Sequence, residues 1–292
     1  MSKRVVAIGV FDGVHIGHQD LIRRAKELAD RLTLPLTALT FHPHPMSIVK
    51  NSRVELLSTL EQRTRWLSDL GVDDVHVCDF TKERSEQSPD DFVTTFLMST
   101  LHAAVVVIGE GFRFGHKAAG TAETIRAHGL EVIEVAHTLF GEERVSSTRI
   151  RASLLGGDLK NVTSMLGKNF QVEGRVVEGF QRGRELGFPT ANVAFDPSVV
   201  LPIDGVYAGY LNVDDIHMPA AISIGYNATF QAEMRTLEAH VLTKDWVDLY
   251  DKKVSAEFVT FIRPMQAFDG VEALTQAIEN DILSVKKALN LG

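Results

Sequence analysis

The chain has 292 residues, which is long enough for two domains that each bury a hydrophobic core. Its formal net charge of −8 argues against nucleic acid or an anionic membrane as the main partner. No stretch approaches the ~20 consecutive apolar residues that span a membrane, and the apolar run near the start is too short for a signal peptide. These features predict a cytoplasmic protein with no membrane partner.

A strand, a glycine-rich turn and a helix are predicted at the start of the chain. Residues 5–10 are continuously apolar, which is typical of a strand covered on both faces of a parallel sheet. Gly9 lies in this run and Gly13 and Gly17 follow it, and apolar residues then recur at helical spacing over 21–32. Open α/β folds bind phosphates at such a turn, where His15 and His18 could donate hydrogen bonds. The alternative is an ordinary glycine turn with two solvated histidines.

Strand-like and helix-like segments alternate through the rest of the first half. This alternation predicts a doubly wound parallel sheet with helices on both faces. Strands are expected at 36–41, 75–80, 104–108 and 130–135, and helices at 60–70, 89–101 and 121–128.

Beyond residue 167 the pattern changes to short strands separated by close turns, with no long helix before residue 270. This pattern predicts an antiparallel β-barrel followed by one C-terminal helix. We therefore expect two domains, 1–167 and 168–292. The barrel strands are expected at 170–177, 206–213, 220–224, 237–242 and 255–262.

Several motifs in order resemble one enzyme family. Residues 9–18 read G-V-F-D-G-V-H-I-G-H, which resembles the H-x-G-H signature of nucleotidylyltransferases and most closely that of bacterial bifunctional riboflavin kinase/FAD synthetases. The resemblance continues through nearly the whole chain. Its further motifs are T-F-H-P-H-P at 40–45, G-E-G-F-R-F-G at 109–115, V-S-S-T-R-I-R at 145–151, G-F-Q-R-G-R-E-L-G-F-P-T-A-N at 179–192 and T-L-E-A-H at 236–240.

For the first domain, the resemblance implies a nucleotidylyltransferase-like fold that adenylylates FMN, with His15 and His18 as catalytic residues. Gly111 departs from the family, which usually has Asn or Asp there. The implied nucleotide- and phosphate-binding residues are Gly9, Phe11, Asp12, Gly17, Ser147, Thr148 and Arg151. The implied flavin-binding residues are His44, Pro45, Phe112, Arg113 and Phe114.

For the second domain, the resemblance implies phosphorylation of riboflavin. An alcohol is a poor nucleophile at neutral pH, so a general base should help, and the resemblance places that base at Glu238. The alternative is an ordinary glutamate that faces solvent or pairs with an arginine. The implied phosphate-binding residues are Gly183, Arg184, Gly187, Thr190 and Asn192, of which Thr190 and Asn192 would also bind Mg²⁺, and the implied flavin-binding residues are Arg263 and Phe268.

The resemblance thus implies an enzyme that makes FMN from riboflavin and ATP, and then FAD and pyrophosphate from FMN and ATP. Mg²⁺ is expected with ATP. Riboflavin, FMN and ATP are the expected small-molecule partners, and apo-flavoproteins would receive the flavin by transient transfer. Two alternatives stay open: a single-function riboflavin kinase with a weakened first domain, and a first domain that senses nucleotides without turning them over.

Overall fold

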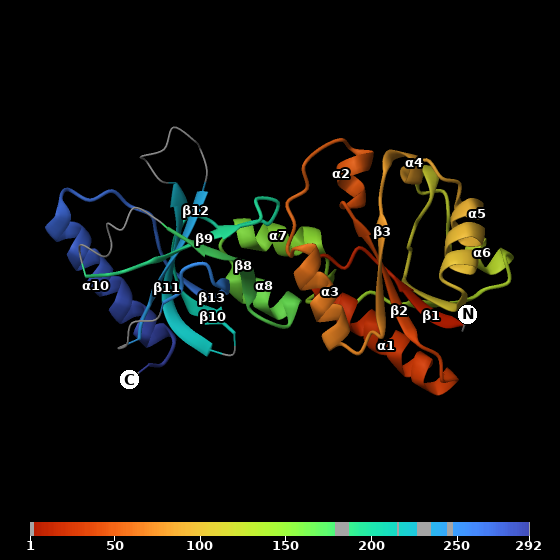
Figure 1. Cartoon of the computed structure of the whole chain (residues 1–292), viewed down its shortest axis with the longest axis horizontal. Helices are drawn as coiled ribbons and strands as arrows, with labels where there is room; N and C mark the ends of the chain where they lie inside the picture. Colours follow the sequence, from red (N-terminus) through yellow and green to blue (C-terminus); the bar gives the residue numbers. More distant parts are fainter. Residues whose placement is uncertain (1–2, 179–186, 215, 227–234, 244–247, 292) are drawn as a thin grey trace. The chain divides into compact units, whose positions relative to one another are not determined.

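The computed structural model describes residues 3–178, 187–214, 216–226, 235–243 and 248–291 (Figure 1). The chain separates into two compact units, Met1–Ser147 and Thr148–Gly292, and each is described by itself. The predicted boundary between residues 167 and 168 falls inside the second unit and stays a prediction. Within the described residues, no helix combines the length and apolar character needed to cross a membrane.

The first unit contains a five-stranded sheet in the order β3-β2-β1-β4-β5. All four neighbouring pairs run parallel, which confirms the predicted doubly wound sheet. Chain connections leave β1 in opposite directions across the sheet, so a topological switch point lies between β1 and β4. The strands are β1 (Arg4–Ile8), β2 (Leu36–His42), β3 (Asp74–Asp79), β4 (Ala103–Gly109) and β5 (Glu131–Val135).

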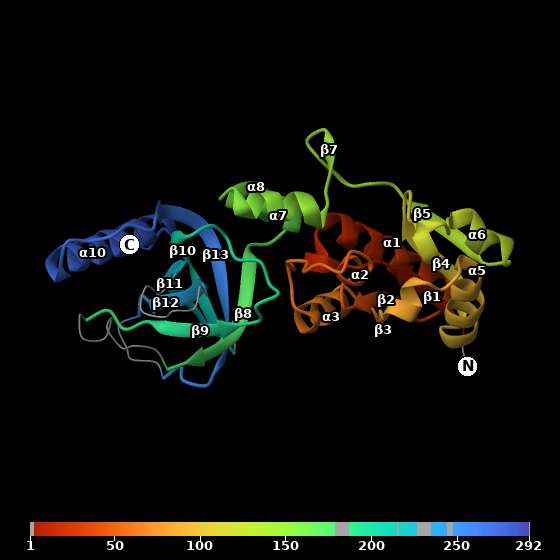
Figure 2. The ribbon, with the colours of Figure 1, turned by 90° about the horizontal axis from the view of Figure 1, so that it is seen from above.

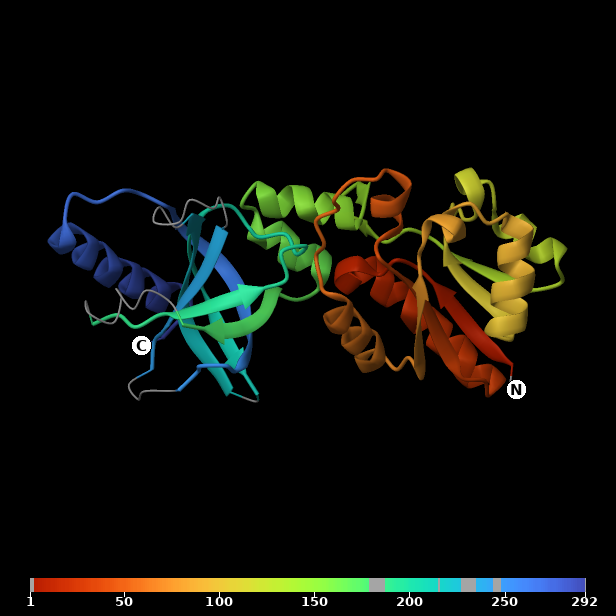
Figure 3. The ribbon, with the colours of Figure 1, turned by 45° about the horizontal axis from the view of Figure 1, so that its top comes forward.

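Helices cover both faces of this sheet (Figure 3). Alternate residues of β1 point to opposite faces: Val5 and Ala7 pack with α1 (Ile16–Leu32) and α3 (Leu60–Asp69), whereas Val6 and Ile8 pack with the helices of the other face. Those helices are η2 (Phe92–Thr100) and α6 (Ala122–Ala127), and the short turn α5 (Pro89–Asp91) leads into η2. The shorter elements are η1 (Asp12–Val14), α2 (Pro45–Val49), α4 (Lys82–Ser85), η3 (His116–Ala118) and the hairpin of β6 (Leu139–Phe140) and β7 (Glu143–Arg144).

The helix predicted over 89–101 forms as one short turn, α5, followed by the nine-residue π-helix η2. The wider winding lets Ser99 and Thr100 hydroxyls donate to carbonyls five residues earlier, at 2.8 and 2.9 Å. It also stacks Phe92 on Phe96, with ring centroids 5.6 Å apart. Hydrophobic spacing indicates a helix here but does not separate an α-helix from a π-helix.

Helix α7 (Ser147–Leu155) begins at the last residue of the first unit and continues into the second. There α8 (Leu159–Leu166) follows and packs against β8 and β13 of the barrel (Figure 2). Six antiparallel strands close the barrel in the order β10-β11-β12-β9-β8-β13, which confirms the predicted antiparallel barrel. The C-terminal helix α10 (Val271–Ala288) packs on its outside. The strands are β8 (Phe170–Val177), β9 (Ala191–Phe195), β10 (Gly205–Val213), β11 (Ile216–Tyr226), β12 (Arg235–Val241) and β13 (Lys253–Pro264).

Strand β9 was not predicted. Its five residues follow directly on the Gly-Phe-Pro-Thr segment, whose turn-forming residues masked the short strand in the sequence. In the structure β9 closes the barrel by pairing with both β8 and β12.

Candidate active sites

Two stacked histidines lie at the start of α1. Their ring centroids are 3.6 Å apart and their planes differ by 15°. His15 is the N-cap of α1, and its Nδ1 accepts a hydrogen bond from the His18 backbone N–H at 3.3 Å. Because Nδ1 accepts, the proton of the neutral His15 ring lies on Nε2, which can donate to a ligand.

Burial keeps both histidines neutral. His15 is only 6% exposed, and burial lowers its pKa from 6.5 to about 4. The pKa of His18 lies well below 6.5, first because of burial and then because of repulsion from His15 and Arg63. The alternative of two solvated histidines is therefore wrong.

Three of the residues predicted to bind nucleotide shape the turn through close packing. A side chain at Gly9 would lie 2.9 Å from the ring of Phe11, which is fully buried with φ 54°. A side chain at Gly17 would meet the His15 ring at 3.3 Å. These residues hold the histidines in place, and only their backbone groups are left to meet a ligand.

Asp12 is buried, and its carboxylate joins the turn to the segment before α3. It accepts hydrogen bonds from the backbone N–H groups of Leu57 (3.0 Å) and Ser58 (3.2 Å). The Asp12 carbonyl accepts from the Ser147 hydroxyl at 2.9 Å. Ser147 thus lies beside the histidine turn, and its contact with phosphate stays a prediction. Thr148 and Arg151 belong to the second compact unit, and their placement around the histidines stays a prediction.

In the second unit, Glu238 on β12 lies beside two residues of the Pro-Thr-Ala-Asn segment. Asn192 is its direct partner across β9 and β12, so both side chains face the same side of the sheet. The Thr190 hydroxyl donates to the Glu238 carboxylate at 3.4 Å. Burial raises the pKa of Glu238, and the Thr190 hydrogen bond opposes part of that rise. The alternative of a solvent-facing glutamate is wrong.

A cavity of about 720 Å³ includes Thr190 in its wall. The segment from Gly187 to Ala191 forms one side, and the end of α10 contributes Lys286. His240 lies in the wall and donates from Nδ1 to the Pro189 carbonyl at 2.9 Å, which leaves its Nε2 as an acceptor. Gly187 has φ +86°, and no atom of the described residues lies within 4 Å of a Cβ placed there, so its contact with phosphate stays a prediction.

Comparisons with known proteins agree with this two-site arrangement. A family model of FAD synthetase matches residues 1–149, and one of riboflavin kinase matches residues 166–289. A bifunctional riboflavin kinase/FMN adenylyltransferase from Listeria monocytogenes is 36% identical over 286 residues, covering 96% of this chain and 90% of the relative. Its counterpart from Bacillus subtilis is 31% identical over 290 residues, with the same coverage of 96% and 90%. The chain belongs to the bifunctional riboflavin kinase/FMN adenylyltransferase family.

The whole fold recurs in a crystal structure from Streptococcus pneumoniae described as a macrolide-efflux protein. It is 30% identical, superposes with a TM-score of 0.89, and the match covers 98% of this chain and 94% of that one. We call residues 1–147 the FAD synthetase unit and residues 148–292 the riboflavin kinase unit from here on.

Within the FAD synthetase unit, His44 and Pro45 lie just after β2. His44 is the N-cap of α2, and its Nδ1 accepts from the Met46 backbone N–H at 3.1 Å. Pro45 is the first residue of that helix. Both side chains are half-buried, so each keeps a surface for a ligand.

The two phenylalanines of the loop after β4 differ in burial. Phe114 is buried and packs on Phe92, with ring centroids 5.3 Å apart, whereas Phe112 is only half-buried and Arg113 is exposed. Of the two rings, Phe112 therefore has the exposed surface that a flavin could contact. The buried ring of Phe114 stacks on it, with ring centroids 5.9 Å apart.

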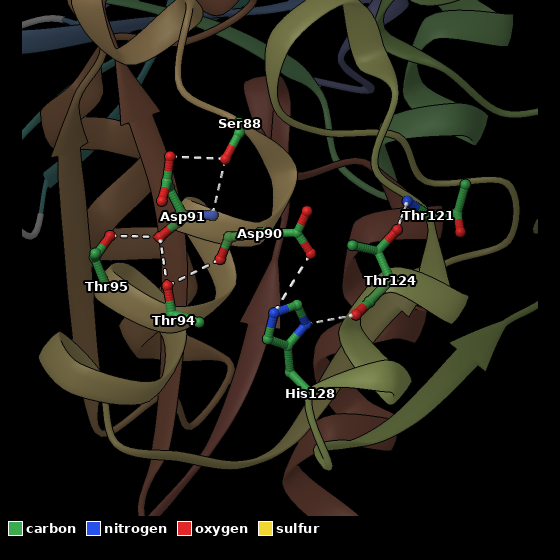
Figure 4. A network of polar contacts seen from close by, with 8 residues as sticks. All are labelled: Ser88, Asp90, Asp91, Thr94, Thr95, Thr121, Thr124 and His128. Atoms are coloured by element: carbon green, nitrogen blue, oxygen red, sulfur yellow. Dashed lines mark hydrogen bonds and ion pairs between the residues drawn. The ribbon is translucent and has the colours of Figure 1, made fainter.

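The helices next to this loop are tied together by a polar network (Figure 4). His128 after α6 donates from Nδ1 to the Thr124 carbonyl at 3.0 Å, and its Nε2 lies 3.4 Å from the Asp90 carboxylate of α5. Asp90 precedes Phe92, which packs on Phe114. The network thus holds α5 and α6 together next to Phe92, which packs against the loop. The residues drawn with them are Ser88, Asp91, Thr94, Thr95 and Thr121.

In the riboflavin kinase unit, Arg263 is engaged by a carboxylate. Its Nε and Nη2 both lie 2.7 Å from the Asp281 carboxylate of α10, which is only 7% exposed. The guanidinium also lies 5.6 Å from the ring of Phe268. This bidentate pair fixes α10 to β13, so a flavin contact by Arg263 would share the group with Asp281. The predicted Gly183 and Arg184 lie outside the described residues.

Sequence reasoning missed Arg63, a buried arginine beside the histidine site. The sequence spacing indicates that Arg63 is buried, because it shares the apolar face of α3 with Leu67 and Leu70 at positions i, i+4 and i+7. A charged residue on such a face must find polar partners inside the protein.

Transfer reactions of ATP generally use a divalent metal ion. Among the described residues, no three His, Cys, Asp or Glu side chains gather as a metal site. The Thr190 and Asn192 side chains offer neutral oxygens beside the Glu238 carboxylate. Such a donor set suits a hard cation that is held largely by the phosphates of ATP.

Proposed function

We propose that Glu238 serves the kinase reaction and that His15 and His18 serve adenylyl transfer. The kinase unit moves the γ-phosphoryl group of ATP to the 5′-hydroxyl of riboflavin and yields FMN and ADP. The synthetase unit moves the adenylyl group of a second ATP to FMN and yields FAD and pyrophosphate. The observation that carries this proposal is the contrast between a desolvated carboxylate in one unit and neutral imidazole donors in the other.

In the kinase reaction, Glu238 removes the proton of the attacking hydroxyl. Burial raises the pKa of Glu238, which makes its carboxylate a stronger base than one in water. The Thr190 hydroxyl donates to that carboxylate and holds it toward the Pro-Thr-Ala-Asn segment, where the phosphates are expected. The hydroxyl oxygen then forms a bond to the γ-phosphorus as the bond to ADP breaks.

In adenylyl transfer, the phosphate of FMN attacks the α-phosphorus of ATP. This phosphate is already largely ionised, since its second pKa is about 6, and it needs no base. Charge builds on the phosphate oxygens as pyrophosphate leaves, and the neutral histidine N–H groups donate to it. Asp12, Gly9 and Gly17 keep the rings in place.

We propose Mg²⁺ as the divalent ion, with Thr190 and Asn192 as its ligands in the kinase unit. Side-chain oxygens from one sheet face, beside a carboxylate, fit its preference for oxygen. When bound, the ion neutralises charge on the phosphates of ATP. The products FMN and FAD would pass to apo-flavoproteins by transient transfer, and the whole sequence of reactions would take place in the cytoplasm.

Liquid chromatography of the full chain with riboflavin, ATP and Mg²⁺ tests the proposal. We expect FMN to appear first and FAD to follow. A single-function kinase would accumulate FMN and leave supplied FMN unchanged. A nucleotide-sensing first unit would bind ATP without releasing pyrophosphate.

A further inference from the structure

A buried arginine that the proposed mechanism does not use lies at the carboxyl ends of β1 and β2. Arg63 is 1% exposed and heads the largest fully buried side chains of the described residues. It lies in the first turns of α3, directly after the capping box formed by Thr59 and Gln62. Burying a guanidinium is costly, so its partners must offset that cost.

The partners of Arg63 come from both strand ends. Its Nη1 donates to the Val10 carbonyl (3.0 Å), the Thr40 hydroxyl (3.3 Å) and the Phe41 carbonyl (3.2 Å). The Thr40 hydroxyl itself donates to the Val10 carbonyl at 2.9 Å. One nitrogen of Arg63 therefore joins the residues that leave β1 to the residues that end β2.

This junction lies where the ladder between the two strands ends. The parallel register runs to Ile8 and Leu39, and the last ladder-like bond joins the Gly9 N–H to the Leu39 carbonyl at 3.1 Å. Beyond it, the carbonyls of Val10 and Phe41 are bound by Arg63. The guanidinium thus replaces backbone pairing where the strands separate.

The two segments that Arg63 joins lead to different predicted substrate sites. Val10 leads into the turn that carries His15 and His18, and Phe41 leads into the segment that carries His44. Burial lowers the pKa of Arg63, and the attraction of Asp12 opposes that shift. The positive charge of Arg63 adds to burial and to His15 in lowering the pKa of His18. Arg63 therefore joins the two segments by hydrogen bonds and also adds positive charge that acts on His18.

We propose that Arg63 is a positioning residue for adenylyl transfer, which sets the separation between the histidine turn and the segment after β2 and so aligns ATP with the phosphate of FMN. This inference rests on the proposed function of the FAD synthetase unit. Small errors in the alignment of two reacting groups lower the rate strongly, so a loss of this junction should act on kcat more than on KM.

Arg63→Met and Arg63→Lys, in the full chain, test this role. With saturating ATP and FMN, we expect kcat for FAD formation to fall roughly ten- to a hundredfold in both variants. FMN formation from riboflavin in the same samples should stay unchanged. Arg4→Met is the matched control, because Arg4 joins β1 to β2 at the opposite end of the strands through the Thr37 hydroxyl at 3.0 Å. It should retain full FAD formation.

A titration of the histidine rings by NMR separates positioning from simple packing. The His18 signal is assigned by its absence in His18→Gln. Its pKa should rise in Arg63→Met, which removes the repelling charge, and should stay near wild type in Arg63→Lys, which keeps it. The lysine side chain ends in a single nitrogen and differs in length and shape from arginine, so it cannot reproduce the same hydrogen bonds. The kcat should therefore still fall in Arg63→Lys.

Retention of more than half of kcat by an Arg63 variant with the wild-type melting temperature would overturn the inference, as would an unchanged His18 titration in Arg63→Met. A loss of FAD formation in Arg4→Met as large as in Arg63→Lys would also overturn it. Absence of FAD formation in the wild-type chain would instead refute the proposed function.

Discussion

Burial acts on the two candidate sites in opposite chemical directions. In the FAD synthetase unit it lowers the pKa of His15 to about 4, so the ring is neutral and serves as a donor. In the riboflavin kinase unit it raises the pKa of Glu238 and strengthens a base. In both, removal from water disfavours the charged form. One physical effect therefore acts in the direction that each proposed role requires, a neutral donor in one unit and a stronger base in the other.

The sites also differ in what holds them. The histidines depend on contacts between segments far apart in the sequence, such as Asp12 with Leu57 and Ser58. Glu238 depends on its neighbours across two barrel strands, Asn192 and the nearby Thr190. Substitutions should therefore separate the two activities cleanly.

Glu238→Gln should remove most FMN formation and leave conversion of supplied FMN to FAD intact. A general base typically contributes 10²–10⁴-fold, so we expect a loss of roughly that size. Glu257→Gln is the matched control, because Glu257 is a half-buried barrel glutamate whose carboxylate accepts from Asn169 at 2.7 Å. Chromatography of both reactions measures the effect. More than about a tenth of the kinase rate in Glu238→Gln would remove Glu238 from this role.

His18→Ala should have the opposite selectivity. Loss of a donor to developing phosphate charge typically costs about 10²–10³ in kcat, and the kinase reaction should continue at the wild-type rate. His76→Ala serves as a control in the same unit, since His76 packs edge-on against Phe96, with ring centroids 5.4 Å apart. Equal losses in the two histidine variants would indicate a structural effect and contradict the assignment.

The sequence predicted the strand, turn and helix that carry the two histidines, whereas the roles of the site residues stay predictions. An uninterrupted apolar run, glycines and a helical pattern were enough for β1, the turn and α1, because each signal is local. The tautomer of His15 could not be predicted, since it depends on which backbone group the ring caps. The Arg263–Asp281 pair joins a strand to a helix 18 residues later, and only packing selects that partner among many. Arg63 stands on the apolar face of α3 in the sequence pattern, but its partners at the ends of β1 and β2 are likewise selected only by packing.

The depressed pKa of His15 predicts a stability difference with pH. The folded chain keeps His15 neutral down to about pH 4, whereas the unfolded chain binds the proton near pH 6.5. This contribution is complete above pH 6.5 and is lost as the pH falls toward 4. Between pH 7 and pH 5 it should amount to about 2 kcal/mol.

His15→Asn isolates this effect, because Asn can still cap α1 but does not titrate. From pH 7 to pH 5, the unfolding free energy of the wild type should fall by that amount relative to that of the variant. Hydrogen exchange of the α1 and β1 amides measures both free energies. A difference that stays constant with pH would mean that His15 is accessible to protons in the folded chain.

Gly111→Asn should strengthen the binding of FMN in the FAD synthetase unit, and this is the smallest effect that we expect. The glycine has φ +70°, and no atom of the described part of the chain lies within 4 Å of where a side chain would begin. Asn adopts this left-handed backbone more easily than most residues, so the substitution fits with little strain. A new hydrogen bond to a charged phosphate is worth about 1.5–3 kcal/mol, and the cost of ordering the loop side chain opposes it.

We therefore expect the KM for FMN in Gly111→Asn to fall by about tenfold, with kcat little changed. Gly129→Asn is the matched control, because Gly129 has φ +81° and equally open surroundings at the turn before β5. Steady-state FAD formation measures both variants. An unchanged or higher KM in Gly111→Asn alone would mean that this loop meets the flavin nucleotide through its backbone and through Phe112, so that a polar side chain at position 111 has no partner to bind.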